Sequence, residues 1–351
     1  MSIVDKMAPN KLSKIITKKD IQNIRTKIRL VSLALRLPCQ CNFNCGYCYG
    51  KIRTNDSLLK FNEIKNILLQ ASELNARTVE IVGEGEPLLY PHFKELINYI
   101  DNLDMTITLY SNCSLITAKD ANFLFKKNVT VIGKQNTLSS EKQNGICGVD
   151  ESFQKIMKGL NNLIKTGFTE TKPSRLGLHT VILKENIDEI PNMWREWRIK
   201  NIIPQVQALV YPSKKQTKEY FEYYNHNAVK PAKIRRLFEE LSNIDKKEFG
   251  INWNPIIAYP IAPDGCRTVY GTLGVTQEGN AQICSFTEKP LGNLREKSIK
   301  EIISSEEVRR IRNIGRLLKY PDEGYGCRAN ALNMTGDYFA PDPFFDDFLS
   351  Y

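Results

Sequence analysis

One short run of cysteines constrains this chain more than any other feature of its sequence. Cys41, Cys45 and Cys48 lie within eight residues, spaced CxxxCxxC, directly after the apolar stretch from Leu30 to Pro38. Thiolates bind iron–sulfur clusters and zinc rather than hard cations. Three thiolates on one tight loop can hold three irons of a cubane cluster and leave the fourth iron open. The run therefore predicts a [4Fe–4S] site whose open iron binds a substrate or cofactor.

Two other uses of these thiols fit the sequence less well. Structural zinc sites usually combine two CxxC pairs, or Cys with His, and the chain has only three His, none of them near the run. Disulfides form in oxidising compartments, whereas the chain shows no apolar signal segment and has an odd number of cysteines, nine. We therefore expect reduced thiols in a cytoplasmic protein.

The composition is that of an ordinary globular protein large enough for a sizeable core. Of the 351 residues, 42% are hydrophobic and 25% are charged. No stretch approaches the roughly 18 apolar residues of a membrane span. The net charge of +10 is spread along the chain, and there is no basic stripe with aromatics or known nucleic-acid module. This charge would suit an anionic small substrate or an acidic electron donor.

The alternation of short apolar runs with helical periodicity predicts parallel strands joined by right-handed crossovers. The predicted strands are 30–37, 78–82, 105–110, 129–133, 175–182 and 203–210. The predicted helices between them are 60–74, 93–103, 118–125, 153–165 and 187–198. Further on, residues 213–247 are expected to be helical, 267–275 and 281–286 to form a β-hairpin, and 298–313 to form one helix.

A second motif follows the second predicted strand. Residues 78–82 are apolar and lead into Gly83-Glu84-Gly85-Glu86-Pro87. Together with the CxxxCxxC loop and the aromatic Tyr47 before its last cysteine, this segment resembles the radical S-adenosylmethionine (SAM) superfamily, with Glu84 replacing a usual small residue. In that family the open iron chelates SAM, and an electron from the reduced cluster cleaves SAM to methionine and a 5′-deoxyadenosyl radical.

The resemblance implies a partial (β/α)6 TIM barrel with its site at the carboxyl ends of the strands. It also implies that SAM is contacted by residues at these strand ends. The expected SAM-binding residues are Tyr47, Gly83, Glu84, Gly85, Glu86, Ser111, Asn112, Lys134 and Asn186.

A second cysteine set, Cys266, Cys284 and Cys327, surrounds the predicted hairpin and the helix after it. An isolated cysteine is usually a buried small hydrophobe. The arrangement, however, resembles the C-terminal auxiliary-cluster domains called SPASM and twitch. It implies one auxiliary iron–sulfur cluster, expected to be [4Fe–4S], with one iron left for a substrate group, a water or a non-cysteine ligand such as Asp264 or Asp337.

These features divide the chain into four expected segments. They are an N-terminal helical extension (1–29), the radical SAM partial barrel (30–212), a helical bridge (213–262) and a twitch/SPASM-like auxiliary domain (263–351).

The expected function is that of an oxidoreductase-like radical SAM enzyme. The radical would abstract a C–H hydrogen for dehydrogenation or epimerisation of a small polar metabolite, such as a sugar, aminocyclitol or nucleoside. Cys113 and Cys147 are candidate hydrogen donors for epimerisation, with packing roles as the alternative. A peptide-modifying maturase is the second hypothesis, and a non-catalytic electron carrier is the third. A flavodoxin or ferredoxin is the expected reductant.

Overall fold

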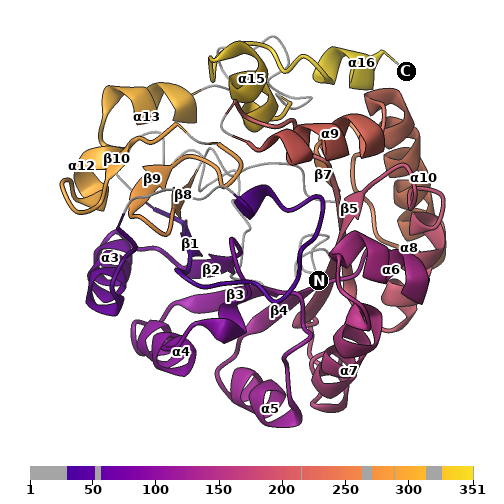
Figure 1. Cartoon of the computed structure of the whole chain (residues 1–351), viewed down its shortest axis with the longest axis horizontal. Helices are drawn as coiled ribbons and strands as arrows, with labels where there is room; N and C mark the ends of the chain where they lie inside the picture. The colour runs from indigo at the N-terminus through magenta and orange to yellow at the C-terminus, as the bar shows by residue number, and fades with distance from the viewer. Residues whose placement is uncertain are drawn as a thin grey trace.

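An open, curved sheet forms the centre of the protein. The computed structural model describes residues 30–51, 57–214, 216–262, 271–287, 289–313 and 326–350. The strands follow the order β10-β9-β8-β1-β2-β3-β4-β5-β6-β7. Strands β1 to β6 are parallel and lie side by side in chain order. They are β1 (Ser32–Arg36), β2 (Thr78–Val82), β3 (Thr106–Ser111), β4 (Thr130–Lys134), β5 (Leu176–Ile182) and β6 (Ile203–Ala208). Figure 1 shows them curving around a central space.

Helices cover the outside of this sheet. They are α3 (Phe61–Glu73), α4 (Phe93–Asn102), α5 (Ala118–Lys126), α6 (Ser140–Cys147), α7 (Ser152–Lys165) and α8 (Ile190–Ile199). In Figure 1 they form an outer ring around the strands. Each crossover thus returns the chain to the next parallel strand, which confirms the predicted partial barrel.

Helix α6 is absent from the sequence-based prediction, which has no helix between the strand at 129–133 and the helix at 153–165. Cys147 is the last residue of α6. The helix is capped by Ser139, whose Oγ accepts a hydrogen bond from the Lys142 backbone N at 3.4 Å. It buries Gln143 and only two apolar side chains. Without an apolar stripe, its sequence carries no helical periodicity to detect.

The two faces of the strands differ in chemistry. On β2, Val79 and Ile81 are fully buried in the core beneath the helices, while Glu80 and Val82 line the interior of the barrel. Alternation along a strand places successive side chains on opposite faces. The same pattern gives the barrel interior a set of polar side chains: Arg36, Glu80, Lys134, His179, Gln205 and Gln207.

Beyond the barrel, two helices and two small sheet additions follow. The bridge consists of α9 (Lys218–Asn227) and α10 (Pro231–Phe249), and β7 (Ile261–Ala262) pairs antiparallel to β6. At the other edge, β8 (Thr272–Val275) pairs parallel to β1 and forms the predicted hairpin with β9 (Asn280–Gln282), and β10 (Gly292–Asn293) pairs with β9. The expected N-terminal extension and the start of the predicted hairpin lie outside the described residues.

The single helix predicted over 298–313 is wrong. The structure has two helices there, α12 (Ile299–Ile303) and α13 (Glu306–Arg312). The break comes at Ser304 and Ser305, because the Ser305 Oγ accepts from the Val308 backbone N at 3.3 Å and begins a new helix. No helix among the described residues is long and apolar enough to cross a membrane.

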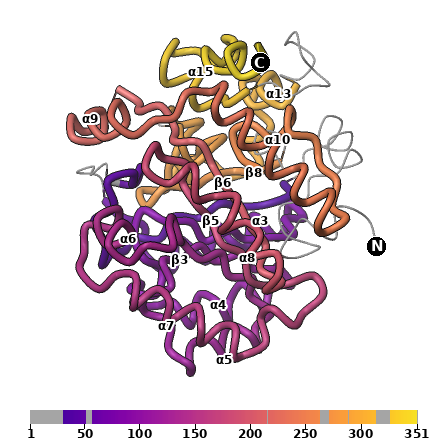
Figure 2. The backbone as a smooth tube through the Cα atoms, turned by 90° about the vertical axis from the view of Figure 1, so that its right-hand side faces the viewer, coloured from indigo at the N-terminus to yellow at the C-terminus, as the bar shows by residue number. Residues whose placement is uncertain are grey.

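Helix α15 (Arg328–Thr335) bridges the two edges of the open sheet. The Asn333 Nδ2 on α15 donates to the Tyr211 carbonyl, after β6, at 2.8 Å and to the Phe286 carbonyl, after β9, at 3.4 Å. Figures 1 and 2 both place α13 and α15 on the side of the molecule opposite α5. The short helix α16 (Phe345–Leu349) packs against α10. The C-terminal part thus covers the opening that the partial barrel leaves.

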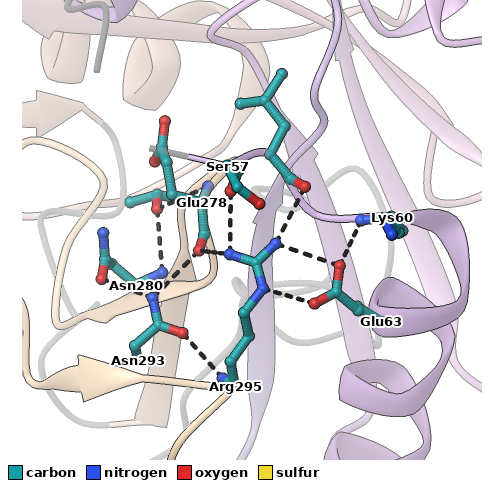
Figure 3. Close-up of polar contacts among 9 residues, drawn as sticks. Ser57, Lys60, Glu63, Glu278, Asn280, Asn293 and Arg295 are labelled. Carbon is teal, nitrogen blue, oxygen red and sulfur yellow. Dashed lines mark hydrogen bonds and ion pairs between the residues drawn. The ribbon is translucent and has the colours of Figure 1, made fainter. Parts of the chain in front are cut away.

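Arg295 ties the C-terminal hairpin to the barrel (Figure 3). Its guanidinium forms a bidentate pair with Glu63 on α3, with N···O distances of 2.6 and 3.2 Å. It also donates to the carbonyls of Ser57, Leu58 and Glu278, each at 3.0 Å. All five N–H donors of the guanidinium are therefore used. The contact joins α3, the segment before it and the hairpin turn.

Replacement of Arg295 by lysine is expected to lower the free energy of unfolding by about 1–2 kcal/mol, because an ammonium cannot reproduce the planar fork. Urea denaturation measures this loss. The control is Lys289→Gln, which removes one exposed pair with Glu307 and should change stability by less than about 0.5 kcal/mol. Equal losses of stability in the two variants would contradict a stabilising role for these contacts of Arg295.

Candidate active site

Most of the predicted site residues line one cavity inside the barrel. Its volume is about 350 Å³. The strands contribute the polar inner face, and the loops after β1, β2, β3 and β9 contribute the rest. The predicted residues found in its lining are Cys41, Cys45, Tyr47, Cys48, Gly83, Glu84, Gly85, Glu86, Ser111, Asn112, Lys134 and Cys284.

The cysteine loop rests on the end of α6. The backbone N–H groups of Asn44 and Gly46 donate to the carbonyls of Cys147 and Ile146 at 2.9 and 3.4 Å. Tyr47 is half-buried, and its hydroxyl accepts from the Asn136 Nδ2 at 3.3 Å. These contacts fix the loop so that its thiols line the cavity.

The donor set of this loop fits an iron–sulfur cluster. Three thiols are soft ligands, and all three line the same space. Among the described residues, no three His, Cys, Asp or Glu side chains are grouped to hold a single metal ion. The three thiols line one cavity and could hold a cluster with one iron left for another ligand.

The glycine-rich segment packs directly on the cysteine loop. A Cβ added at Gly85 would lie 2.3 Å from the Cys39 carbonyl oxygen and 2.7 Å from the Gln40 carbonyl oxygen. The Glu86 backbone N donates to that same Gln40 carbonyl at 2.8 Å. Only glycine allows such a close approach of two backbones. The two motifs therefore form one structural unit.

The carboxylate of Glu86 joins the ends of β2 and β3. It accepts from the Ser111 Oγ at 2.8 Å, from the Asn112 backbone N at 2.8 Å and from the Leu88 backbone N at 3.3 Å. The Asn112 Nδ2 donates to the Asn42 Oδ1 at 2.9 Å. Glu86 and Ser111 therefore organise the rim of the cavity by bonding to each other.

Burial raises the pKa of Glu86 to about 7 from its ordinary value of 4.5, although three donors favour the charged form. Between these two values the folded protein binds more protons than the unfolded one, so its stability falls as the pH rises. Glu86→Gln is therefore expected to flatten the pH dependence of the free energy of unfolding. Urea denaturation of the metal-free protein between about pH 5 and about pH 8 measures it. If the free energy of unfolding changed with pH equally in the wild type and Glu86→Gln, a raised pKa of Glu86 would be contradicted. Equal flattening by the exposed Glu73→Gln would also contradict it.

Glu84, the departure from the resemblance, has a partner on β1. Its carboxylate pairs with Arg36, whose guanidinium also donates to the Ser285 carbonyl. Ser285 follows Cys284 in the chain. Arg36 therefore joins the glycine-rich segment to the C-terminal part, a contact between residues far apart in the sequence.

Among the predicted SAM-binding residues and hydrogen donors, three do not line the cavity: Cys113, Cys147 and Asn186. Cys113 is fully buried, and burial raises the pKa of its thiol well above the ordinary value. Cys147 is buried, and its Sγ accepts from the Gln143 Nε2 at 3.1 Å. The Asn186 side chain bonds to the backbone of Leu183, Asn136 and Val181. Its polar atoms thus hold the loop after β5.

The second cysteine set is only partly described. Cys284 lines the cavity, while Cys327 is buried and its backbone N donates to the Asp342 carboxylate at 2.5 Å. Cys266 and Asp264 lie outside the described residues. The carboxylate of Asp337, which is exposed, accepts from the Phe339 backbone N at 2.9 Å.

The sequence-based analysis missed the polar inner face of the barrel. Its members include Arg36, Glu80, His179, Gln205 and Gln207. A signal was present, because a parallel strand covered on both faces should be a continuous apolar run. Gln205 and Gln207 at alternate positions of β6, and His179 within β5, break that rule and mark the inner face.

The barrel, the cysteine loop and the glycine-rich segment define an enzyme that binds SAM at an iron–sulfur cluster. Residues 36–195 match the family model of the radical SAM superfamily, and residues 266–328 match the SPASM iron–sulfur cluster-binding domain. The chain thus contains a radical SAM domain followed by a C-terminal SPASM domain. Its cofactors are accordingly SAM, a [4Fe–4S] cluster and an auxiliary iron–sulfur cluster.

Similar proteins of known name include two kinds of enzyme. The AdoMet-dependent heme synthase of Methanosarcina barkeri is 21% identical over 341 residues, which cover 89% of this chain and 95% of the relative. The GTP 3′,8-cyclase of Psychromonas ingrahamii is 27% identical over 278 residues, covering 73% of this chain and 77% of the relative.

Solved structures with the same fold include Streptococcus suis SuiB bound to S-adenosylmethionine. The TM-score is 0.69 at 19% identity, covering 93% of this chain and 80% of that one. Another is anSMEcpe with bound AdoMet and the Cp18Cys peptide, with a TM-score of 0.67 at 16% identity, covering 91% of this chain and 96% of that one.

Proposed function

We propose that this enzyme dehydrogenates a small polar metabolite, such as a sugar, an aminocyclitol or a nucleoside. Cys41, Cys45 and Cys48 would hold the SAM-binding cluster, and residues 83–86 with Ser111 and Asn112 would form the SAM site. Cys266, Cys284 and Cys327 would hold the auxiliary cluster. The corresponding domain division is 30–212 for the barrel, 213–262 for the bridge and 263–351 for the auxiliary domain, after the extension of 1–29.

The observation that carries this proposal is that Cys284 lines the same cavity as the first cysteine set. When bound, the reduced cluster and SAM supply a 5′-deoxyadenosyl radical and release methionine. A hydroxyl-bearing carbon that gives its hydrogen atom to this radical, forming 5′-deoxyadenosine, must lose one more electron and one proton to become a carbonyl. An auxiliary cluster at Cys284 would supply the acceptor for that electron, and the hydroxyl proton would leave to a base or to solvent.

The arrangement of thiols favours dehydrogenation over epimerisation. Epimerisation needs a hydrogen donor facing the substrate carbon. The only thiols in the lining are the first cysteine set and Cys284, so neither Cys113 nor Cys147 is among the described residues that face the cavity. The polar inner face, with Gln205, Gln207 and Thr272, also favours a substrate with many hydroxyl or amine groups.

Peptide modification is the second candidate. Chains of the same fold are known with peptides, namely SuiB with its precursor peptide SuiA and anSMEcpe with the Cp18Cys peptide. The identities are 19% and 16%, so these chains support a shared fold only. We also propose that the enzyme acts in the cytoplasm, where thiols stay reduced, with a flavodoxin or ferredoxin as electron donor.

Anaerobic reconstitution with iron and sulfide, followed by dithionite and SAM, tests the proposal. Formation of 5′-deoxyadenosine is expected, and its absence would reject the enzymatic function. Zinc without iron and sulfide in the purified protein would reject the cluster. Incubation with C-deuterated sugars and aminocyclitols should move deuterium into 5′-deoxyadenosine and give a product lighter by two hydrogen atoms. A product of unchanged hydrogen count would favour epimerisation instead.

A further inference from the structure

Strand β6 presents two glutamine amides to the cavity. Gln205 and Gln207 occupy alternate positions of β6, so their side chains lie on the same face of the strand, and both line the cavity. The two residues are about 7 Å apart along the strand. Gln205 is 6% exposed and Gln207 is 7% exposed. The protein therefore encloses both side chains almost completely, and the cavity is the space that stays open to them.

The Gln205 amide has no hydrogen-bond partner within the part of the chain that the structure describes. Its oxygen and nitrogen are not among the polar atoms that the protein fully encloses, so both are open to the cavity. The Gln207 Oε1 lies 3.0 Å from the His179 Nε2, whereas the Gln207 Nε2 has no partner among the same residues. Buried polar groups in folded proteins are almost always hydrogen-bonded. A ligand in the cavity would supply the missing partners.

The chemistry of a carboxamide indicates which ligand groups it can bind. The amide is uncharged, and it holds an accepting oxygen beside a nitrogen with two N–H donors. Two hydroxyl groups on neighbouring carbons match this arrangement, because one can donate to the oxygen while the other accepts from an N–H group. Such a pair brings no charge into the cavity, so its burial requires no counter-charge. The amides therefore favour a ligand with neighbouring hydroxyl groups.

The two amides lie on the arm of the sheet that does not carry the two sequence motifs. The glycine-rich segment follows β2, and β6 is the fourth strand along from β2 in the curved sheet (Figure 1). Apolar side chains lie beside the amides in the lining, namely Ile261, which is the register partner of Gln207, and Leu209 and Val210 after β6. A polyhydroxylated ring fits such a wall, because its hydroxyls can bond to the amides while its C–H groups contact the apolar side chains.

We propose that Gln205, together with Gln207, determines the specificity of the enzyme by binding two hydroxyl groups on neighbouring carbons of the substrate. The inference rests on the proposed function, and it narrows the substrate to a polyhydroxylated ring that presents such a pair to β6. The ribose of SAM carries the same pair of hydroxyls, so the experiments below separate the two sources.

Three replacements of glutamine by methionine test whether the Gln205 amide has a structural role. Gln143 on α6 is fully buried, and its amide accepts from the Asn136 backbone N at 2.8 Å and donates to the Cys147 Sγ at 3.1 Å. Gln154 on α7 is exposed. Methionine has a similar length and a similar helix propensity but no amide. The three variants thus remove a bonded, an exposed and an unbonded amide.

Thermal unfolding of the reconstituted enzyme, measured without a sugar, distinguishes these cases. Gln143→Met should lower the midpoint temperature by about 2 °C or more, because its backbone donors lose their acceptor. Gln154→Met should leave the midpoint unchanged. Gln205→Met should leave it unchanged or raise it, because no hydrogen bond within the protein is lost. A midpoint for Gln205→Met as low as that for Gln143→Met would show a structural role and overturn the proposal.

Equilibrium dialysis of the oxidised, reconstituted enzyme with SAM present tests the binding itself. The probes are myo-inositol and glucose, each compared with its monodeoxy forms, in which one hydroxyl is missing. The wild type and Gln154→Met should bind one parent ring about three- to tenfold more tightly than at least one of its deoxy forms. Gln205→Met should lose this preference, and Gln207→Met should reduce it by a smaller factor. The affinity for SAM should be the same in all four proteins.

Several outcomes would overturn the proposal. They are a wild type without any preference for a parent ring, an unchanged preference in Gln205→Met, and an equal loss in Gln154→Met. Binding of SAM that is three- to tenfold weaker in Gln205→Met would assign the amide to the ribose instead. An unchanged preference in Gln207→Met would remove that residue from the proposal. Formation of 5′-deoxyadenosine is measured separately, because its absence would reject the proposed function, whereas normal formation with an unchanged ring preference would reject only the role of Gln205.

Discussion

Replacement of Cys48 by serine is expected to reduce 5′-deoxyadenosine formation to the background of a reaction without enzyme. A cubane cluster on two thiolates and a weak hydroxyl ligand would lose iron, and SAM would then have no reduced cluster beside it. The iron content of the reconstituted protein should fall by about four atoms per chain, while the auxiliary cluster remains. Iron and sulfide analysis together with product chromatography measure both effects.

The matched control for this substitution is Cys113→Ala. This thiol is fully buried and is not among the residues lining the cavity. The variant should keep its iron and its 5′-deoxyadenosine formation, with a modest loss of stability from the missing sulfur. Full iron content in Cys48→Ser would contradict the ligand assignment. Loss of iron in Cys113→Ala would also contradict it.

The barrel could be predicted because each of its strands and helices has a pattern of apolar residues that is local in the sequence. The bounds of β2 (Thr78–Val82) are those expected, and α3 and α4 begin and end within one residue of theirs. The two motifs come together because the carboxyl ends of parallel strands share one edge of the sheet. The spacing of the three cysteines and the positions of the predicted strands were therefore enough to predict most of the cavity rim.

Other parts of the site depend on contacts that local patterns do not contain. The partner of Glu84 is Arg36, and Arg36 in turn bonds to Ser285, about two hundred and fifty residues away. The contacts of His179 with Lys134 and with Gln207 exist only because β4, β5 and β6 are neighbours in the sheet. Sequence analysis identified Lys134 from its position after a strand but had no means to find what orients it.

Addition of one methyl group at Gly85 is expected to damage the site more than most changes outside the cysteine loop. The new Cβ would lie 2.3 Å from one backbone oxygen and 2.7 Å from another, and backbone atoms of the cysteine loop cannot move away cheaply. Gly85→Ala should lower the free energy of unfolding by about 3 kcal/mol. It should also separate the two motifs and weaken SAM-dependent turnover by about 10²-fold.

Gly145→Ala provides the comparison for this clash. A Cβ at Gly145 would meet nothing within 4 Å, and the residue lies inside α6. Alanine in a helix interior is favoured over glycine by about 0.5–1 kcal/mol, so this variant should be as stable as the wild type or more stable. Thermal unfolding and 5′-deoxyadenosine formation are measured for both variants. If Gly85→Ala matched Gly145→Ala in both, the close packing of the glycine-rich segment on the cysteine loop would not be what shapes the SAM site.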